Sequence, residues 1–207
     1  MPTLRPATLQ DLPAIARLSH ATLLLGREAP WVFPSERLWG EVFVAPYLRA
    51  GCCNLVAEEE GKVLGYILGA CSGFALFWDL LPRLPLLLLR IGLGVYGPPL
   101  PHLRYLLRLL RFPGPKAPLG RYPAHLHIAV GLEARGKGVG RLLLVAFLDC
   151  LRAKGVPGVQ LATTRANQAA RRLYQSLGFR LYAKKASPFW APYHGHPVIH
   201  EVWVKEL

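Results

Sequence analysis

Residues 125–144 read HLHIAVGLEARGKGVGRLLL and predict a β-strand, a glycine-rich turn and the start of an α-helix. In residues 124–130 the side chains alternate with the period of a strand, so that His125, His127 and Ala129 share one face. Beyond the turn, apolar residues recur every three or four positions, as on one side of an amphipathic helix. A helix N-terminus presents unpaired N–H groups, and glycines let an anion approach them. The stretch therefore predicts a phosphate-binding site.

The spacing in the turn excludes two common phosphate-binding motifs. A Walker A loop needs a hydroxyl residue after its lysine to hold Mg²⁺, but Gly138 follows Lys137. A dinucleotide-binding fingerprint that starts at Gly136 would need its third glycine where Arg141 stands. The pattern that remains in residues 135–140 is R-x-x-G-x-G.

A second segment follows the helix in the order expected of one known family. Residues 159–163 predict a short strand, and Asn167 is placed to cap a helix that ends at Gly178. Residues 167–179 read NQAARRLYQSLGF. This string and the R-x-x-G-x-G turn resemble the two signatures of the GCN5-related N-acetyltransferases, and the resemblance covers about residues 124–185.

The resemblance implies an α/β fold with a mixed, mostly antiparallel sheet and helices on both faces. Family members pass from the third to the fourth strand through a short turn, whereas residues 72–121 form a basic, leucine-rich insertion here. We expect this insertion to be helical, with a basic amphipathic helix at residues 101–112 that packs over the sheet and leaves its arginines in solvent. No linker or repeat interrupts residues 1–207, so we expect a single domain.

The resemblance also implies an activity, which is acetyl transfer from acetyl-CoA to the amine of a small molecule by direct attack, without a metal. Two alternatives stay open. One is a non-catalytic acyl-CoA-binding module, and the other is a peptide or protein N-acetyltransferase.

The same resemblance assigns site residues. The backbone of Ile128 and Val130 would pair with the pantetheine arm of the cofactor, and the turn would hold its pyrophosphate. The full set of predicted cofactor contacts is Ile128, Val130, Arg135, Gly136, Lys137, Gly138, Val139, Gly140, Arg141, Asn167, Ala170 and Tyr174.

Two residues are predicted to be catalytic. The resemblance makes Tyr174 the general acid that protonates the leaving thiolate. His127 is our candidate general base, because histidine suits deprotonation of an amine near neutral pH. His125 is an alternative, and His200 and Glu201 are weaker ones. The string HLHIA also resembles a subgroup related to the acetyltransferase-like domain of O-GlcNAcases, where an aspartate stands in place of Ala129.

Composition bounds the partners. The net charge of +13 suits an anionic ligand, and it argues against a polycationic acceptor. We expect neither nucleic-acid binding nor membrane association, although association of either kind through the basic residues 83–121 stays open as a rival interpretation, and homodimer formation also stays open. The four cysteines show no metal-ligand or disulfide spacing, so we expect unpaired thiols and a cytoplasmic location. We expect an acceptor with an apolar or ring-bearing body, to suit the aromatic residues Trp31, Phe33, Phe189, Trp190 and Tyr193.

Overall fold

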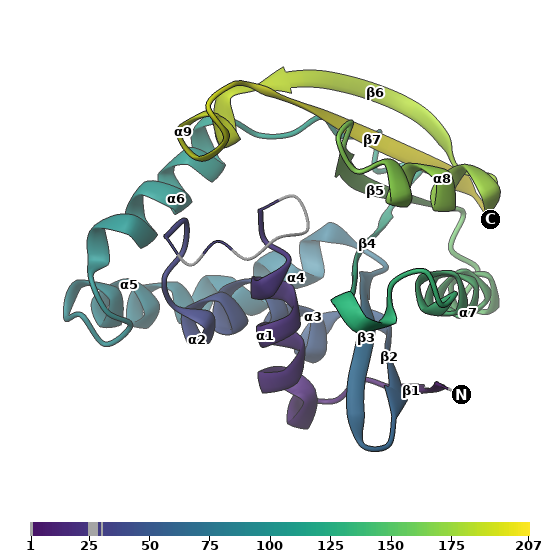
Figure 1. Ribbon diagram of the computed structural model, residues 1–207, viewed down its shortest axis with the longest axis horizontal. Coiled ribbons are helices and arrows are strands. Elements are labelled where there is room, and N and C mark those ends of the chain that lie inside the picture. Colours follow the sequence, from purple (N-terminus) through teal and green to yellow (C-terminus); the bar gives the residue numbers. More distant parts are fainter. Residues whose placement is uncertain (1, 25–28, 30) are drawn as a thin grey trace.

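The computed structural model describes residues 2–24, 29 and 31–207, which build one open sheet with helices on both of its faces (Figure 1). The sheet has seven strands in the order β1-β2-β3-β4-β5-β7-β6. Neighbouring strands are antiparallel, except that β4 and β5 are parallel. The strands are β1 (Thr3–Pro6), β2 (Cys52–Glu59), β3 (Lys62–Ala70), β4 (Ala124–Val130), β5 (Gly158–Thr164), β6 (Arg180–Ser187) and β7 (Val198–Glu206).

The helices confirm the predicted fold class, including the helical insertion between the third and fourth strands. The first of these helices ends at Ala21. A π-helical turn (Gly40–Val44) joins α2 to α3. The helices are α1 (Leu12–Ala21), α2 (Glu36–Trp39), α3 (Ala45–Ala50), α4 (Gly73–Leu80), α5 (Leu84–Gly92), α6 (Pro99–Arg111), α7 (Val139–Ala153), α8 (Gln168–Ser176) and α9 (Ala191–His194).

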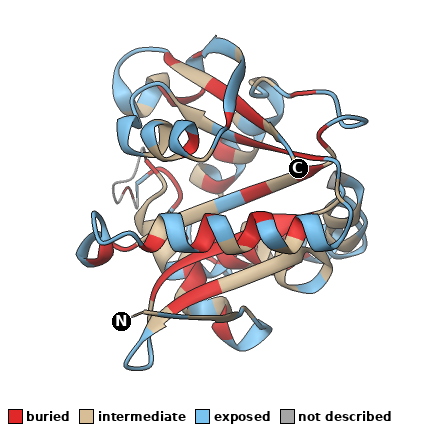
Figure 2. Ribbon diagram, turned by 90° about the vertical axis from the view of Figure 1, so that its right-hand side faces the viewer, coloured by how far each residue is buried: buried red, intermediate tan, exposed pale blue. Residues whose placement is uncertain are grey.

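The alternation along β4 divides its side chains between two hydrophobic cores. Ala129 packs against the core that lies under α1, α2, α5 and α6. Ile128 and Val130 pack against the core under α7 and α8. Figure 2 shows α7 crossing the sheet, with buried residues interrupting its exposed outer surface. Each face of the sheet therefore has its own core, as the period-two pattern predicts.

The sheet divides between β4 and β5. Only Ala124 and His125 of β4 pair with β5, opposite Val159 and Gln160. Beyond these residues β4 continues to Val130 along β3, and β5 continues to Thr164 along β7. The two halves of the sheet therefore diverge, as Figure 1 shows, and the β5-facing edge of β4 is left unpaired over most of its length.

The insertion is anchored to both halves of the molecule through α6. The ring of Tyr105 packs edge-on against Phe33 and Phe189, at 5.3 Å between centroids in both cases. Arg108 donates hydrogen bonds to the backbone carbonyls of Phe189, at 3.0 Å, and of Pro188. The inner side of α6 therefore packs against Phe33 and the turn after β6, and Arg108 points inward instead of into solvent as expected. No helix in the described ranges is both long and apolar enough to cross a lipid bilayer.

The expectation of unpaired thiols is wrong. Cys52 is bonded to Cys71, and Cys53 is bonded to Cys150. The first disulfide links the start of β2 to the residue after β3, and the second links β2 to α7. Residues that are far apart in sequence are brought together by the hairpin register and by the packing of α7, which spacing alone does not reveal. Free thiols therefore no longer support a cytoplasmic location.

Candidate functional site

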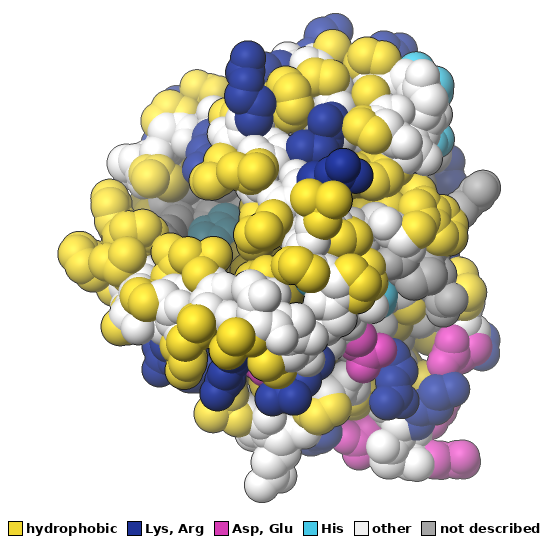
Figure 3. Space-filling view, turned by 90° about the vertical axis from the view of Figure 1, so that its left-hand side faces the viewer, with side chains coloured by type: hydrophobic (Ala, Val, Ile, Leu, Met, Phe, Trp, Pro, Cys, Tyr) yellow, Lys and Arg dark blue, Asp and Glu magenta, His cyan; other side chains and the backbone are white. Residues whose placement is uncertain are grey.

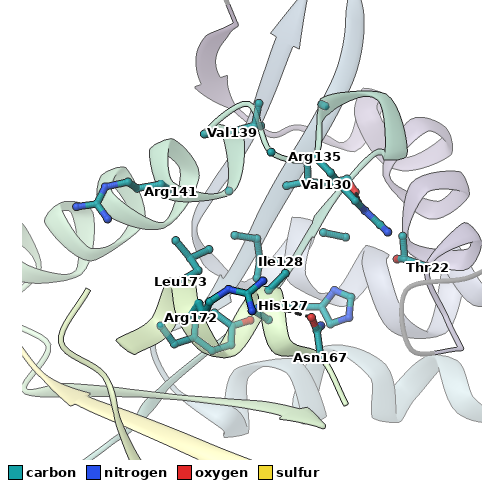
Figure 4. Close-up of a pocket in the computed structure, with 18 residues that line it drawn as sticks. Thr22, His127, Ile128, Val130, Arg135, Val139, Arg141, Asn167, Arg172 and Leu173 are labelled. Carbon is teal, nitrogen blue, oxygen red and sulfur yellow. Dashed lines mark hydrogen bonds between the residues drawn. The ribbon is translucent and has the colours of Figure 1, made fainter. Parts of the chain in front are cut away.

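A cavity of about 520 Å³ lies where the two halves of the sheet diverge (Figure 4). One wall comes from β4 and from the turn that leads into α7, and the other comes from α8. The lining residues are Thr22, His127, Ile128, Ala129, Val130, Ala134, Arg135, Gly136, Gly138, Val139, Gly140, Arg141, Asn167, Ala169, Ala170, Arg172, Leu173 and Tyr174. The cavity thus gathers all the predicted site residues except Lys137.

The glycine turn forms the mouth of this cavity. Gly136 and Gly138 have φ angles of 76° and 82°, which favour glycine, and the space where their side chains would stand is open. Gly138 is the N-cap of α7, a helix of 15 residues. The first N–H groups of such a helix have no partner within it, and they carry the positive end of the helix dipole. The mouth therefore offers N–H donors and positive potential that suit an anion.

Arginine side chains strengthen this positive potential. Arg135 Nε donates to the carbonyl oxygen of Val130 at 3.3 Å, and Arg141 donates to Ser176 Oγ at 3.1 Å. Arg172 also lines the cavity from α8. Arg172, Ala169 and Thr22 line the cavity although the sequence did not predict them; Ala169 and Arg172 lie on the same side of α8. None of the described residues that line the cavity is acidic.

His127 is held by a chain of buried polar groups that starts in α1. The indole Nε1 of Trp39 donates to Ser19 Oγ at 2.9 Å, and Ser19 hydrogen-bonds the hydroxyl of Tyr66. The Tyr66 hydroxyl lies 2.8 Å from His127 Nδ1, and the two rings stack. In the part of the chain that the structure describes, His127 Nε2 has no hydrogen-bond partner, so this nitrogen remains for a ligand.

The surroundings of His127 favour its neutral form. Although the side chain is open to the cavity, the protein around it lowers the pKa of His127 to about 4, with the nearby His125 adding to the effect. Burial also raises the pKa of Tyr66 above its usual value, so this phenol keeps its proton. A neutral His127 can accept a proton at Nε2 only when Nδ1 carries the hydrogen and donates it to Tyr66.

Tyr174 stands on the opposite wall, in α8. Asn167 caps this helix by accepting a hydrogen bond from the backbone N–H of Ala170 at 3.2 Å. Burial raises the pKa of Tyr174, so the phenol stays protonated at neutral pH. Among the described residues, its hydroxyl has no hydrogen-bond partner. The hydroxyl is therefore a donor that a ligand in the cavity can use.

The other candidate bases lie elsewhere. His125 packs edge-on against Tyr47, with 5.6 Å between the ring centroids. Glu201 is buried and accepts hydrogen bonds from Arg171 at 3.1 Å and from Trp203 at 3.0 Å, which is a structural arrangement. His200 is half-buried on β7 and is not among the lining residues. His127 is thus the candidate base that lines the cavity.

Three of the aromatic residues that we expected to contact the acceptor lie elsewhere. Phe33, Phe189 and Trp190 are buried in the core around Tyr105, and they do not line the cavity described above. In the ranges that the structure describes, no group of three or more histidine, cysteine or acidic residues is placed to hold a metal ion.

Comparison with known proteins decides the family. The model of the acetyltransferase (GNAT) family matches residues 21–179, which is most of the chain. The chain belongs to the GNAT acetyltransferase family. The match includes the glycine turn, α7 and α8, so the cavity lies within the part that the family shares.

Individual relatives agree with this assignment. Over 56 residues the chain is 45% identical to a mycothiol acetyltransferase of Thermomonospora curvata, and this match covers 27% of the chain and 19% of the relative. The chain therefore spans about a fifth of the length of such curated relatives.

Solved GNAT structures share the fold. A phosphinothricin acetyltransferase from Sinorhizobium meliloti, solved with acetyl-CoA, has a TM-score of 0.63 at 21% identity, covering 100% of this chain and 88% of that one. A ribosomal-protein-alanine N-acetyltransferase from Brucella melitensis has a TM-score of 0.63 at 20% identity, with 99% of both chains covered.

Proposed function

We propose that this GNAT protein is an acetyl-CoA-dependent N-acetyltransferase that acts on the amine of a small molecule. The observation that carries the proposal is the divergence of β4 and β5 after two paired positions, with the N-terminus of α7 at the mouth of the gap. The unpaired edge of β4 suits the amide groups of an extended pantetheine arm. The positive mouth, free of acidic residues, suits a pyrophosphate.

The residues of the chain take distinct parts in this reaction. When bound, acetyl-CoA supplies an acetyl thioester, whose carbonyl carbon an amine attacks and whose C–S bond then breaks. The N–H groups at the start of α7 and the side chains of Arg135 and Arg141 bind the pyrophosphate. His127 Nε2 accepts the proton that the amine loses, and the Tyr174 hydroxyl donates a proton to the departing sulfur. The two proton transfers balance, so no metal or covalent enzyme intermediate is required.

The charge around the cavity also bears on the acceptor. The described lining residues include three arginines and no carboxylate, so a polyamine or an aminoglycoside would meet like charge from them. We therefore propose an acceptor with a single amine, such as an amino acid, an amino sugar or an aryl-alkyl amine. A peptide N-terminus remains the second candidate acceptor.

The test compares two glycines of the same helix. Gly138 and Gly155 flank α7, both have a positive φ, and both would leave an added side chain in open space. The variants Gly138→Asp and Gly155→Asp therefore carry similar backbone strain and the same added charge. We expect Gly138→Asp to lower acetyl-CoA affinity at least tenfold, about 1.4 kcal/mol, in calorimetry, and Gly155→Asp to leave it unchanged. Equal affinities in all three proteins would refute the assigned pyrophosphate site.

A second measurement separates an enzyme from a binding module. Thiol release from acetyl-CoA is followed with a panel of amino acids, amino sugars, aryl-alkyl amines, polyamines, aminoglycosides and short peptides. Turnover with a monoamine supports the proposal. Acetyl-CoA binding without turnover on any amine would identify a binding module, and highest kcat/KM with a polyamine or aminoglycoside would overturn the charge argument.

A further inference from the structure

The insertion presents a large apolar surface to solvent. On α6, Leu100, Leu103, Leu107 and Leu110 recur at spacings of three and four, and Leu107 and Leu110 are 64% and 78% exposed. The opposite side of the helix, with His102 and Tyr105, is buried. The leucines therefore lie on the outward side of α6, whereas an amphipathic helix packed on a sheet would place its leucines inward.

The helices before α6 extend this surface. The chain runs from α4 through a short turn into α5, and α5 contacts α6. Phe77 and Trp78 of α4, Leu86 and Leu89 of α5, and Leu93 after it are all exposed. We call these residues, together with the four leucines of α6, the insert face. Figure 3 shows hydrophobic side chains spread over the side of the molecule where α5 and α6 lie. Monomeric proteins rarely expose so many large apolar side chains together.

Basic side chains predominate on this side. Arg104 and Arg111 lie beside the leucines on the outward part of α6, whereas Arg90 on α5 lies 3.8 Å from the carboxylate of Glu41. Residues 83–121 contain no aspartate or glutamate. The carboxylate of Asp79, in α4, is bound by Arg49 at 2.8 Å and by Arg83 at 2.9 Å. In Figure 3, acidic side chains gather at one edge, away from most of the apolar surface.

We propose that the insert face binds the surface of an anionic phospholipid bilayer. Helices that lie in the interface bury an apolar side among the lipid chains and place arginines at the level of the headgroups. Each basic residue near an anionic surface adds about 1 kcal/mol of attraction. A second copy of this chain fits less well, because its insert face would set arginines against arginines on a protein of net charge +13. This proposal departs from the sequence-based expectation that the protein does not associate with membranes.

Co-sedimentation with vesicles tests the proposal. The probes are vesicles of phosphatidylcholine alone and of phosphatidylcholine with about one third phosphatidylglycerol, in about 0.1 M and about 0.5 M salt. We expect binding to the anionic vesicles in low salt, at least tenfold weaker binding in high salt, and no binding to the neutral vesicles. Binding of equal strength to both kinds of vesicle would overturn the assigned role of charge.

Matched variants locate the surface. Leu107→Ser with Leu110→Ser should weaken vesicle binding at least tenfold, and Leu9→Ser, at another exposed leucine, should not. Arg104→Gln with Arg111→Gln should also weaken binding, whereas Arg152→Gln with Lys154→Gln, exposed at the end of α7, should not. All these variants should keep the thermal stability and the turnover of a small amine in solution.

Two results would overturn the proposal. One is vesicle binding that the insert-face variants leave unchanged, because another surface would then carry it. The other is absence of binding to the anionic vesicles. Analytical ultracentrifugation would then test for a dimer that the leucine variants dissociate. Such a dimer would assign the insert face to a second copy of the chain.

Discussion

The hydroxyl of Tyr66 on β3 lies 2.8 Å from Nδ1 of His127 on β4, and the two rings stack at 19° between their planes. Tyr66 is fully buried, whereas His127 is open to the cavity. Tyr66 therefore acts on the site through His127 and is a positioning residue. Its phenol oxygen can accept the Nδ1 hydrogen, and this arrangement leaves the lone pair of Nε2 toward the cavity.

Replacing Tyr66 by phenylalanine should change the tautomer of His127 without changing the binding of the cofactor. Tyr66→Phe removes the acceptor for the Nδ1 hydrogen, so the unproductive tautomer becomes accessible. We expect kcat to fall about tenfold, or about 1.4 kcal/mol, with unchanged acetyl-CoA affinity. Tyr182→Phe, at an exposed tyrosine, is the control. An unchanged kcat in Tyr66→Phe would show that the hydroxyl does not set the state of His127.

The depressed pKa of His127 predicts the pH dependence of the reaction. In the proposed reaction the proton acceptor is the neutral ring, which prevails above a pKa of about 4. Between about pH 5.5 and 7.5, kcat/KM should therefore rise only with deprotonation of the acceptor amine, with no step from a histidine. The measurement is a pH profile with two amines of different pKa. A step near pH 6.5 that is common to both amines and absent in His127→Asn would contradict the prediction.

Tyr174 should matter for chemistry more than for binding. Tyr174→Phe keeps the ring against Phe179 and removes only the hydroxyl, which has no partner in the described part of the chain. We expect kcat to drop about 10²-fold, or about 2.7 kcal/mol, while acetyl-CoA affinity and thermal stability stay near those of the original protein. Single-turnover acetyl transfer measures the effect. If both proteins turn over equally, Tyr174 is only a packing residue.

The two disulfides should contribute unequally to stability. Cys53 and Cys150 are 97 residues apart in the sequence, whereas Cys52 and Cys71 are 19 apart. A cross-link that closes a longer loop restricts the unfolded chain more. Cys53→Ser with Cys150→Ser should lower the free energy of unfolding by about 2–4 kcal/mol in denaturant titration, and Cys52→Ser with Cys71→Ser by less. Equal losses in the two double variants would contradict the loop-length argument.

Local patterns made much of this structure predictable. The period-two pattern of residues 124–130 defines β4 to the residue, and the spacing of apolar residues with Gly138 at the N-cap predicts the start of α7. Each of these patterns lies within a single strand or helix. The divergence of β4 from β5 could not be predicted in the same way, since it depends on which strand each residue pairs with.

Long-range contacts explain the features of the structure that the sequence did not predict. The pairing of Cys53 with Cys150 depends on how α7 packs against β2. The exposure of Leu107 depends on which side of α6 faces Phe33 and Phe189, and both sides of this helix carry apolar residues. Arg172 lines the cavity because α8 turns that side toward β4. In each case a residue's neighbours come from distant parts of the sequence.

With acetyl-CoA bound as proposed, the gap in the sheet would link the stability of the protein to its co-substrate. The walls of the cavity belong to two halves that share only the pairs Ala124–Val159 and His125–Gln160 in the sheet at this junction. A ligand that contacts both walls joins these halves, and at 100 times its dissociation constant it adds about 2.7 kcal/mol to the stability of the folded state. The protein would then resist proteolysis best when acetyl-CoA is plentiful, so its abundance would follow the acetyl-CoA supply of the cell.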